Sequence, residues 1–133
     1  MSDMEERMKD FAARRRWAVV GVSSNPEKYG HRVFATLLSA GYRAYGVGMT
    51  AEEVLGQRVF PSLADLPETP EVASIVVPPR VTEEIVRQCA QLGISRVWMQ
   101  PGAESEEALQ FCRENGIEVV WDECILVNHL DWP

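Results

Sequence analysis

The 133-residue chain has only two histidines and three cysteines, and these residues form no metal-binding pattern. His31 and His129 lie far apart in the sequence, and Cys89, Cys112 and Cys124 include no Cys-x-x-Cys pair. A zinc site built from such ligands is therefore not expected. An odd number of cysteines without a close pair fits a reducing cytosol better than a disulfide scaffold, so a cytoplasmic protein is expected.

The sequence also lacks an excess of positive charge and a long apolar run. Thirteen Lys and Arg residues stand against 20 Asp and Glu residues, which gives a formal net charge of −7. A nucleic-acid-binding protein needs a basic face, so this class is disfavoured. No apolar stretch approaches the roughly 20 residues of a membrane span, and the charged N-terminal segment does not resemble a signal peptide. Length and composition predict a single globular domain over residues 1–133.

Apolar segments alternate with helical patterns along the chain. The apolar segments show no polar–apolar alternation, which is typical of strands buried on both faces. Strands are predicted at 17–22, 42–47, 72–77, 96–99 and 117–121, and helices over 4–16, 30–40, 82–92 and 106–114. Residues 49–72 are interpreted as an irregular connector with a short helix over 51–55 and a helical turn over 62–66. The alternation predicts an α/β fold, a three-layer, doubly wound, Rossmann-like domain with a parallel sheet of about five strands.

The loop after the first predicted strand has the composition of an anion-binding site. Ligands of open α/β sheets bind beyond the carboxyl ends of the strands. Gly21 permits a tight turn or a close ligand, and Ser23 and Ser24 offer hydroxyl and N–H groups. The next helix directs its positive end to the same place, so the loop predicts a pyrophosphate cradle. A simple capped strand-to-helix turn has the same composition, and the loop alone does not separate the two interpretations.

Two common nucleotide motifs are missing from this loop. A dinucleotide fingerprint needs Gly-x-Gly-x-x-Gly and an acid at the end of the second strand, but only Gly21 and Gly30 occur here and the nearest acid is Glu52. A P-loop needs Gly-Lys-Ser/Thr, which does not occur, so NAD and ATP bound in these ways are disfavoured. A more heavily phosphorylated ligand is favoured by the cations around the loops, which are Lys28, His31, Arg32 and Arg80. Taken singly, each of these residues is better explained as a solvated surface side chain.

Several short motifs, taken in order, resemble the small, stand-alone CoA-binding proteins. They include Val19–Gly30, Pro61–Pro67, Pro78-Pro79, Trp98–Gly102 and Asp122–Ile125, and they span nearly the whole chain. The same domain type forms the CoA-binding part of the succinyl-CoA synthetase alpha subunit. The resemblance implies a Rossmann-like fold that binds coenzyme A, or an acyl-CoA, across the carboxyl ends of its strands.

The resemblance also implies which residues bind the ligand. The Gly21–Asn25 loop and the following helix N-terminus would hold the pyrophosphate, and Val47 and Gly48 would border the adenosine. The prolines after the third strand would form the floor, and the loop after the fourth strand the far wall. The predicted ligand-binding residues are Gly21, Val22, Ser23, Ser24, Lys28, Arg32, Val47, Gly48, Pro78, Pro79, Gln100 and Gly102.

The residues show no catalytic set. An acyl-CoA ligase of this superfamily also needs a phosphorylatable histidine and a nucleotide-grasp domain, for which 133 residues are too few. Neither His31 nor His129 has a partner at a spacing that marks a nucleophile and its base. Cys124 follows the fifth strand, where it could form a mixed disulfide with the CoA thiol or be a small buried hydrophobic residue. The sequence favours a binding protein over an enzyme and predicts no catalytic or metal-binding residue.

Three functions are compatible with these features. The first is a non-enzymatic CoA-binding module, and the second is an accessory subunit that presents CoA to a separate catalytic chain. The third is a dinucleotide-dependent oxidoreductase with an atypical loop, against which the missing acid after the second strand speaks. The expected partners are CoA and either a second copy of the chain or a separate catalytic chain. Nucleic acids and membranes are not expected partners.

Overall fold

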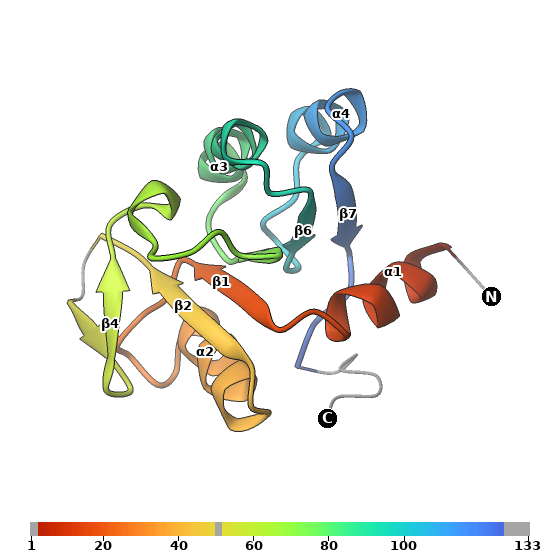
Figure 1. The fold of residues 1–133 in the computed structure, drawn as a ribbon. Helices are drawn as coiled ribbons and strands as arrows, with labels where there is room; N and C mark the ends of the chain where they lie inside the picture. The colour runs from red at the N-terminus through yellow and green to blue at the C-terminus, as the bar shows by residue number, and fades with distance from the viewer. Residues whose placement is uncertain (1–2, 50–51, 127–133) are drawn as a thin grey trace.

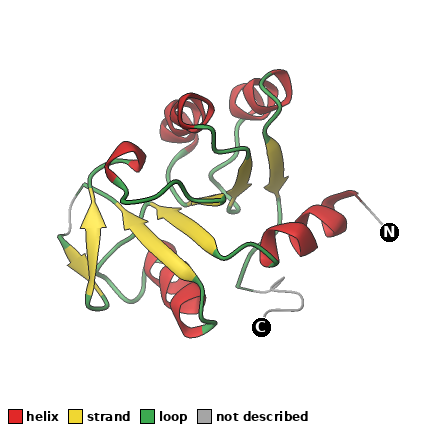
Figure 2. Ribbon diagram, viewed as in Figure 1, coloured by secondary structure: helices red, strands yellow, loops and turns green. Residues whose placement is uncertain are grey.

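The computed structural model describes residues 3–49 and 52–126, which form one mostly parallel sheet with helices on both faces (Figures 1 and 2). The strand order is β3-β4-β2-β1-β5-β6-β7. All neighbouring pairs from β4 to β7 are parallel, and β3 pairs with β4 in the antiparallel sense. The α/β, doubly wound, Rossmann-like prediction is confirmed. In chain order the elements are α1 (Asp3–Ala12), β1 (Arg16–Val20), α2 (Tyr29–Ser39), β2 (Arg43–Val47), β3 (Glu53–Val54), β4 (Gln57–Phe60), η1 (Leu63–Asp65), β5 (Val72–Ile75), α3 (Pro79–Leu92), β6 (Arg96–Met99), α4 (Glu106–Glu114) and β7 (Glu118–Trp121).

The sheet separates two apolar cores. Successive residues of a strand point to opposite faces, so Ala18 and Val20 of β1 join one core, whereas Trp17 and Val19 join the other. The first core includes apolar residues of α3 and α4, and the second includes those of α1 and α2. This double coverage explains why the central strands are continuous apolar runs. Among the described residues, no helix is long and apolar enough to cross a membrane.

The segment between β2 and β5 corrects the prediction of an irregular connector. Glu53–Val54 and Gln57–Phe60 form a hairpin, and β4 extends the parallel sheet beside β2. The short helix predicted over 51–55 is wrong for its described part, because pairing of Glu53 and Val54 with β4 and the burial of Val54 outweigh local helix propensity. Leu55 and Gly56 make the hairpin turn with φ values of 53° and 75°. The helical turn predicted over 62–66 is confirmed as η1.

Both outer strands of the sheet are short or covered. β3 has two residues. At the other side, α1 packs against β7, and Arg7 Nη1 donates a hydrogen bond to the carbonyl oxygen of Val119 at 3.0 Å. The outer edge of β7 therefore has a side-chain donor on one of its backbone acceptors.

Candidate functional site

A cavity of about 620 Å³ lies at the carboxyl ends of β1 and β2 and beside the segment that follows β5. Chain connections leave this region toward opposite faces of the sheet, because α2 follows β1 and α3 follows β5. Open α/β sheets bind ligands at such a position. The lining is mostly apolar and consists of Val20, Gly21, Val22, Ser23, Lys28, Tyr29, Gly30, Val47, Gly48, Met49, Pro61, Ser62, Val76, Val77, Val81, Glu84, Ile85 and Gln88.

Gly21 and Gly30 allow the β1–α2 loop to fold tightly against the sheet. Gly21 has a φ of 104°, and a Cβ atom there would lie 2.2 Å from the carbonyl oxygen of Val76. A Cβ atom on Gly30 would lie 2.1 Å from the carbonyl oxygen of Gly21. The Gly21 amide also donates to the carbonyl oxygen of Val47 at 2.9 Å. The absence of side chains at both glycines therefore brings the α2 N-terminus close to the strand ends.

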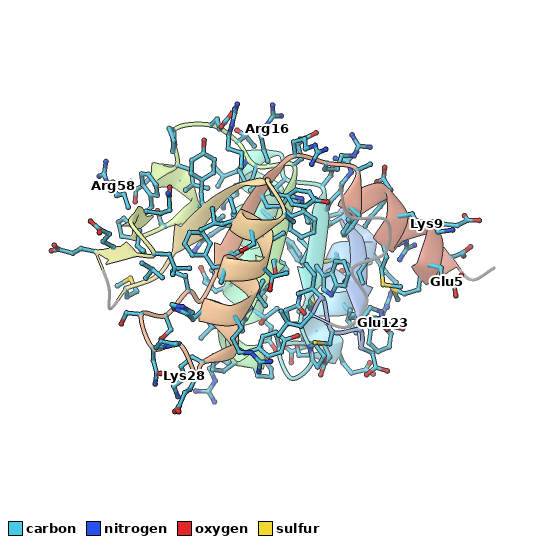
Figure 3. The ribbon with its side chains drawn as sticks, turned by 90° about the horizontal axis from the view of Figure 1, so that it is seen from below. Glu5, Lys9, Arg16, Lys28, Arg58 and Glu123 are labelled. Atoms are coloured by element: carbon cyan, nitrogen blue, oxygen red, sulfur yellow. The ribbon has the colours of Figure 1, made fainter. Side chains whose placement is uncertain are left out.

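The α2 N-terminus supplies the positive end of a helix dipole to the cavity. Its first turn contains no acidic residue, and Lys28 at the N-cap makes no side-chain cap hydrogen bond. The amides of this turn thus suit an anionic ligand. The preceding loop is shaped by its own hydrogen bonds, including Asn25 N to Ser23 Oγ at 3.1 Å and an imidazole–carbonyl contact of 2.9 Å between His31 Nδ1 and Ser23 O. Figure 3 shows Lys28 on the loop before α2, at the edge of the molecule away from Arg16.

Half of the predicted ligand-binding residues line this cavity. They are Gly21, Val22, Ser23, Lys28, Val47 and Gly48. The others lie outside the lining: five are exposed around the loops and one is buried. The exposed residues are Ser24, Arg32, Pro78, Pro79 and Gly102, and the buried residue is Gln100. Contact of any of these residues with a ligand stays a prediction.

Gln100 connects elements of the protein to one another. The residue is 1% exposed, and its Oε1 accepts hydrogen bonds from the Tyr29 hydroxyl at 3.0 Å and from the Ile125 amide at 3.1 Å. Its Nε2 donates to Ser74 Oγ at 3.2 Å. These contacts occupy both acceptor positions of the amide oxygen. Gln100 therefore fixes α2 and the segment after β7 to the sheet.

Tyr29 joins this network to Cys124. The tyrosine lines the cavity, and its hydroxyl shares a hydrogen bond with the thiol of Cys124. Burial, followed by that hydrogen bond, raises the pKa of Tyr29, so the phenol stays protonated at neutral pH. Cys124 is half-buried and is not part of the cavity lining. Its reaction with a CoA thiol stays a prediction, and His129 lies outside the described residues.

Sequence reasoning missed the α3 wall of the cavity. Val81, Glu84, Ile85 and Gln88 share one helix face, as their spacing of three and four residues requires. That spacing predicts a common face but does not say which loop lies opposite. Within the described residues, Glu84 and Lys28 are the only charged residues of the lining, and no group of three or more His, Cys, Asp or Glu residues could hold a metal ion.

Comparisons with known proteins agree with this fold and identify relatives of the chain. The sequence profile described as "CoA binding domain" matches residues 15–130. The uncharacterized protein YneT of Bacillus subtilis is 33% identical over 119 residues, which cover 86% of this chain and 85% of that protein. The alpha subunit of ADP-forming acetate–CoA ligase II from Pyrococcus furiosus is 26% identical over 119 residues, and the match covers 81% of this chain but only 26% of that subunit.

A solved structure shows the same arrangement over nearly the whole chain. The hypothetical protein from Pyrococcus horikoshii OT3 has a TM-score of 0.91 and 32% sequence identity, covering 98% of this chain and 92% of that one. The profile match covers far more than half of the sequence. The chain therefore belongs to the CoA-binding domain family.

Proposed function

We propose that the protein binds coenzyme A or an acyl-CoA as a single domain without a catalytic set of its own. In this proposal the pyrophosphate lies on the Gly21–Asn25 loop and the α2 N-terminus, and the adenosine lies beside Val47 and Gly48. The observation that carries it is the cavity into which the tightly packed β1–α2 loop brings the helix N-terminus and Lys28. Membership of the family supports the identity of the ligand.

The remaining predicted contacts belong to the outer part of the ligand. Arg32, Pro78, Pro79 and Gly102 are exposed at the same end of the sheet, beyond the cavity lining. A CoA molecule is longer than its adenosine diphosphate part, so its other groups would extend across this surface. Lys28, Arg32 and Arg80 are all exposed, so any of the three is available to a ribose phosphate at this end of the sheet.

Ligand-dependent unfolding tests this proposal. CoA at about 100 times its Kd should add about 2.7 kcal/mol to the free energy of unfolding. NAD and ATP at the same concentrations should add much less, because the standard motifs for both are missing from the loop. Thermal unfolding with each ligand, followed by calorimetry, gives the comparison. Equal or larger stabilisation by NAD would favour the dinucleotide-dependent oxidoreductase and refute the proposal.

A second candidate function is that of an accessory subunit presenting CoA to a separate catalytic chain. It is favoured by the similarity to the ligase alpha subunit, in which the matching region makes up only about a quarter of a longer protein. The expected result is co-purification of a second chain under native conditions, with CoA retained in the complex and detected by native mass spectrometry. Purification of the chain alone with bound CoA would favour the stand-alone module.

The buried thiols support the expectation of a cytoplasmic protein. Burial raises the pKa of Cys89 to about 12. It is also the main cause that raises the pKa of Cys112 to about 11. Both side chains lie in the core beside α3 and α4, where they pack as small apolar groups. Such cysteines require no oxidising compartment.

A further inference from the structure

The α3 wall of the cavity carries a hydrogen-bond acceptor that the phosphate contacts do not use. Glu84 and Gln88 lie one turn apart on α3 and line the cavity with Val81 and Ile85. Figure 1 shows α2 and α3 on opposite faces of the sheet, as their separate cores require. Glu84 and Lys28 therefore contribute opposite charges to the cavity from opposite sides.

This separation of charge orients a nucleotide in the cavity. Phosphate groups are attracted by the α2 N-terminus and Lys28, and they are repelled by the Glu84 carboxylate. We therefore place the uncharged base, rather than a phosphate, toward Glu84 on α3. There Val77, Val81 and Ile85 offer apolar surface on which the flat faces of a base can pack.

The Glu84 carboxylate can accept a hydrogen bond from a donor at the edge of that base. Its nearest described cation is Arg87, at 3.7 Å, which is longer than a hydrogen bond. The two side chains are 65% and 55% exposed, so this ion pair is weak. An ionised carboxylate only accepts hydrogen bonds. It therefore suits a base that presents an amine and disfavours one that presents a carbonyl oxygen in the same position.

We propose that Glu84, with Gln88 beside it, accepts a hydrogen bond from the exocyclic amine of adenine and thereby selects adenine over a 6-oxopurine. This inference rests on the proposed function, because it concerns the base of the same ligand. It makes Glu84 a residue that determines specificity, in addition to the loop that holds the phosphates.

The test compares CoA with an analogue in which hypoxanthine replaces adenine, using isothermal titration calorimetry. The unmodified protein should bind CoA about fivefold more tightly than the analogue. This ratio corresponds to a charge-assisted hydrogen bond that is weakened by the exposure of Glu84 to solvent. In the Glu84→Gln variant the new amide can accept from the amine or donate to the carbonyl. The ratio of the affinities for CoA and for the analogue should then fall to about one, because the amide can form a hydrogen bond with either base.

The matched control is Glu83→Gln, which removes the same charge from the same turn of α3. Glu83 is outside the cavity lining, and its carboxylate accepts a hydrogen bond from Ser105 Oγ at 2.8 Å. This variant should keep the fivefold preference, and thermal unfolding without ligand should show that both variants are folded. Equal binding of both ligands by the unmodified protein would overturn the inference, as would equal loss of preference in the two variants. If neither ligand binds the unmodified protein, the proposed function fails and the inference fails with it.

Discussion

The two ends of the parallel strands use charged residues differently. At the amino ends, Arg43 Nη1 lies 3.0 Å from Glu68 Oε2, and Arg14 Nη1 lies 3.8 Å from Glu71 Oε2. At the carboxyl ends, Lys28 lines the cavity and forms no ion pair within the part of the chain that the structure describes. Charges that satisfy one another contribute to stability, whereas charges at a cavity can contribute to ligand binding. The comparison predicts that substitutions at the two ends have separable effects.

Substitution of Gly21 should have the largest effect, because it disrupts the loop at the carboxyl end of β1. In Gly21→Ala the new methyl group meets the carbonyl oxygen of Val76, and the backbone keeps a φ that favours glycine. The free energy of unfolding should fall by about 3 kcal/mol, and CoA binding should be lost. Gly41→Ala is the control, because its φ of 87° is similar but no atom lies within 4 Å of the new Cβ. It should cost only about 1 kcal/mol in urea unfolding. Equal losses in the two variants would show that the close approach at Gly21 is not needed.

A negative charge in the β1–α2 loop should weaken the ligand without breaking the fold. In Ser23→Asp the carboxylate would occupy the place proposed for the pyrophosphate, and CoA affinity should fall at least about tenfold, or 1.4 kcal/mol. Ser24→Asp adds the same charge one residue later, on an exposed side chain outside the cavity lining. Its effect in calorimetry should be smaller, because solvent screens the added charge. An unchanged affinity in Ser23→Asp would mean that the phosphates lie elsewhere.

Relief of a strained turn at the amino ends should change stability alone. Leu55 has a φ of 53° in the β3–β4 turn, and the residue is 48% exposed. Asparagine adopts this backbone conformation more readily, and Asn-Gly is a favoured hairpin turn. Leu55→Asn should raise the free energy of unfolding by about 0.5–1 kcal/mol and leave CoA affinity unchanged. Lower stability of the variant would show that contacts of the leucine side chain outweigh the strain.

The pH dependence of stability should identify the charge contribution of Glu71. Burial, the largest single effect, opposes its ionisation, but hydrogen bonds from the backbone amides of Arg16 and Arg15 and the charges of Arg16 and Arg14 together outweigh it and hold the pKa of Glu71 below the ordinary value of 4.5. Because the folded pKa is the lower one, the stabilisation is present above about pH 4.5 and is lost as the pH falls through the folded value. Glu71→Gln should cost roughly 0.5 kcal/mol at pH 7 and less at pH 3. An equal cost at both pH values would assign the effect to packing instead.

The strands could be predicted because burial on both faces leaves a direct trace in the sequence. The run at 96–99 coincides with β6, and Gly21 was expected at the tight turn that the structure places after β1. The β3–β4 hairpin escaped prediction because its strands are only two and four residues long and its Leu55-Gly56 turn lacks the Asn-Gly or Asp-Gly pair that marks a hairpin in a sequence. The α3 wall of the cavity, which includes Glu84, was not predicted either. Helix spacing defines a face, but only the folded chain shows which residues lie opposite that face.

The protected edges of the sheet limit how copies of this chain can associate. An uncovered strand offers a row of amides and carbonyls to which another molecule can add its own strand, and such addition can continue into an aggregate. Here β3 ends the sheet after two residues, and Arg7 of α1 occupies a carbonyl of β7. Neither edge is a ready template for further strands. At high protein concentration the molecule should therefore resist polymerisation by strand addition at these two edges.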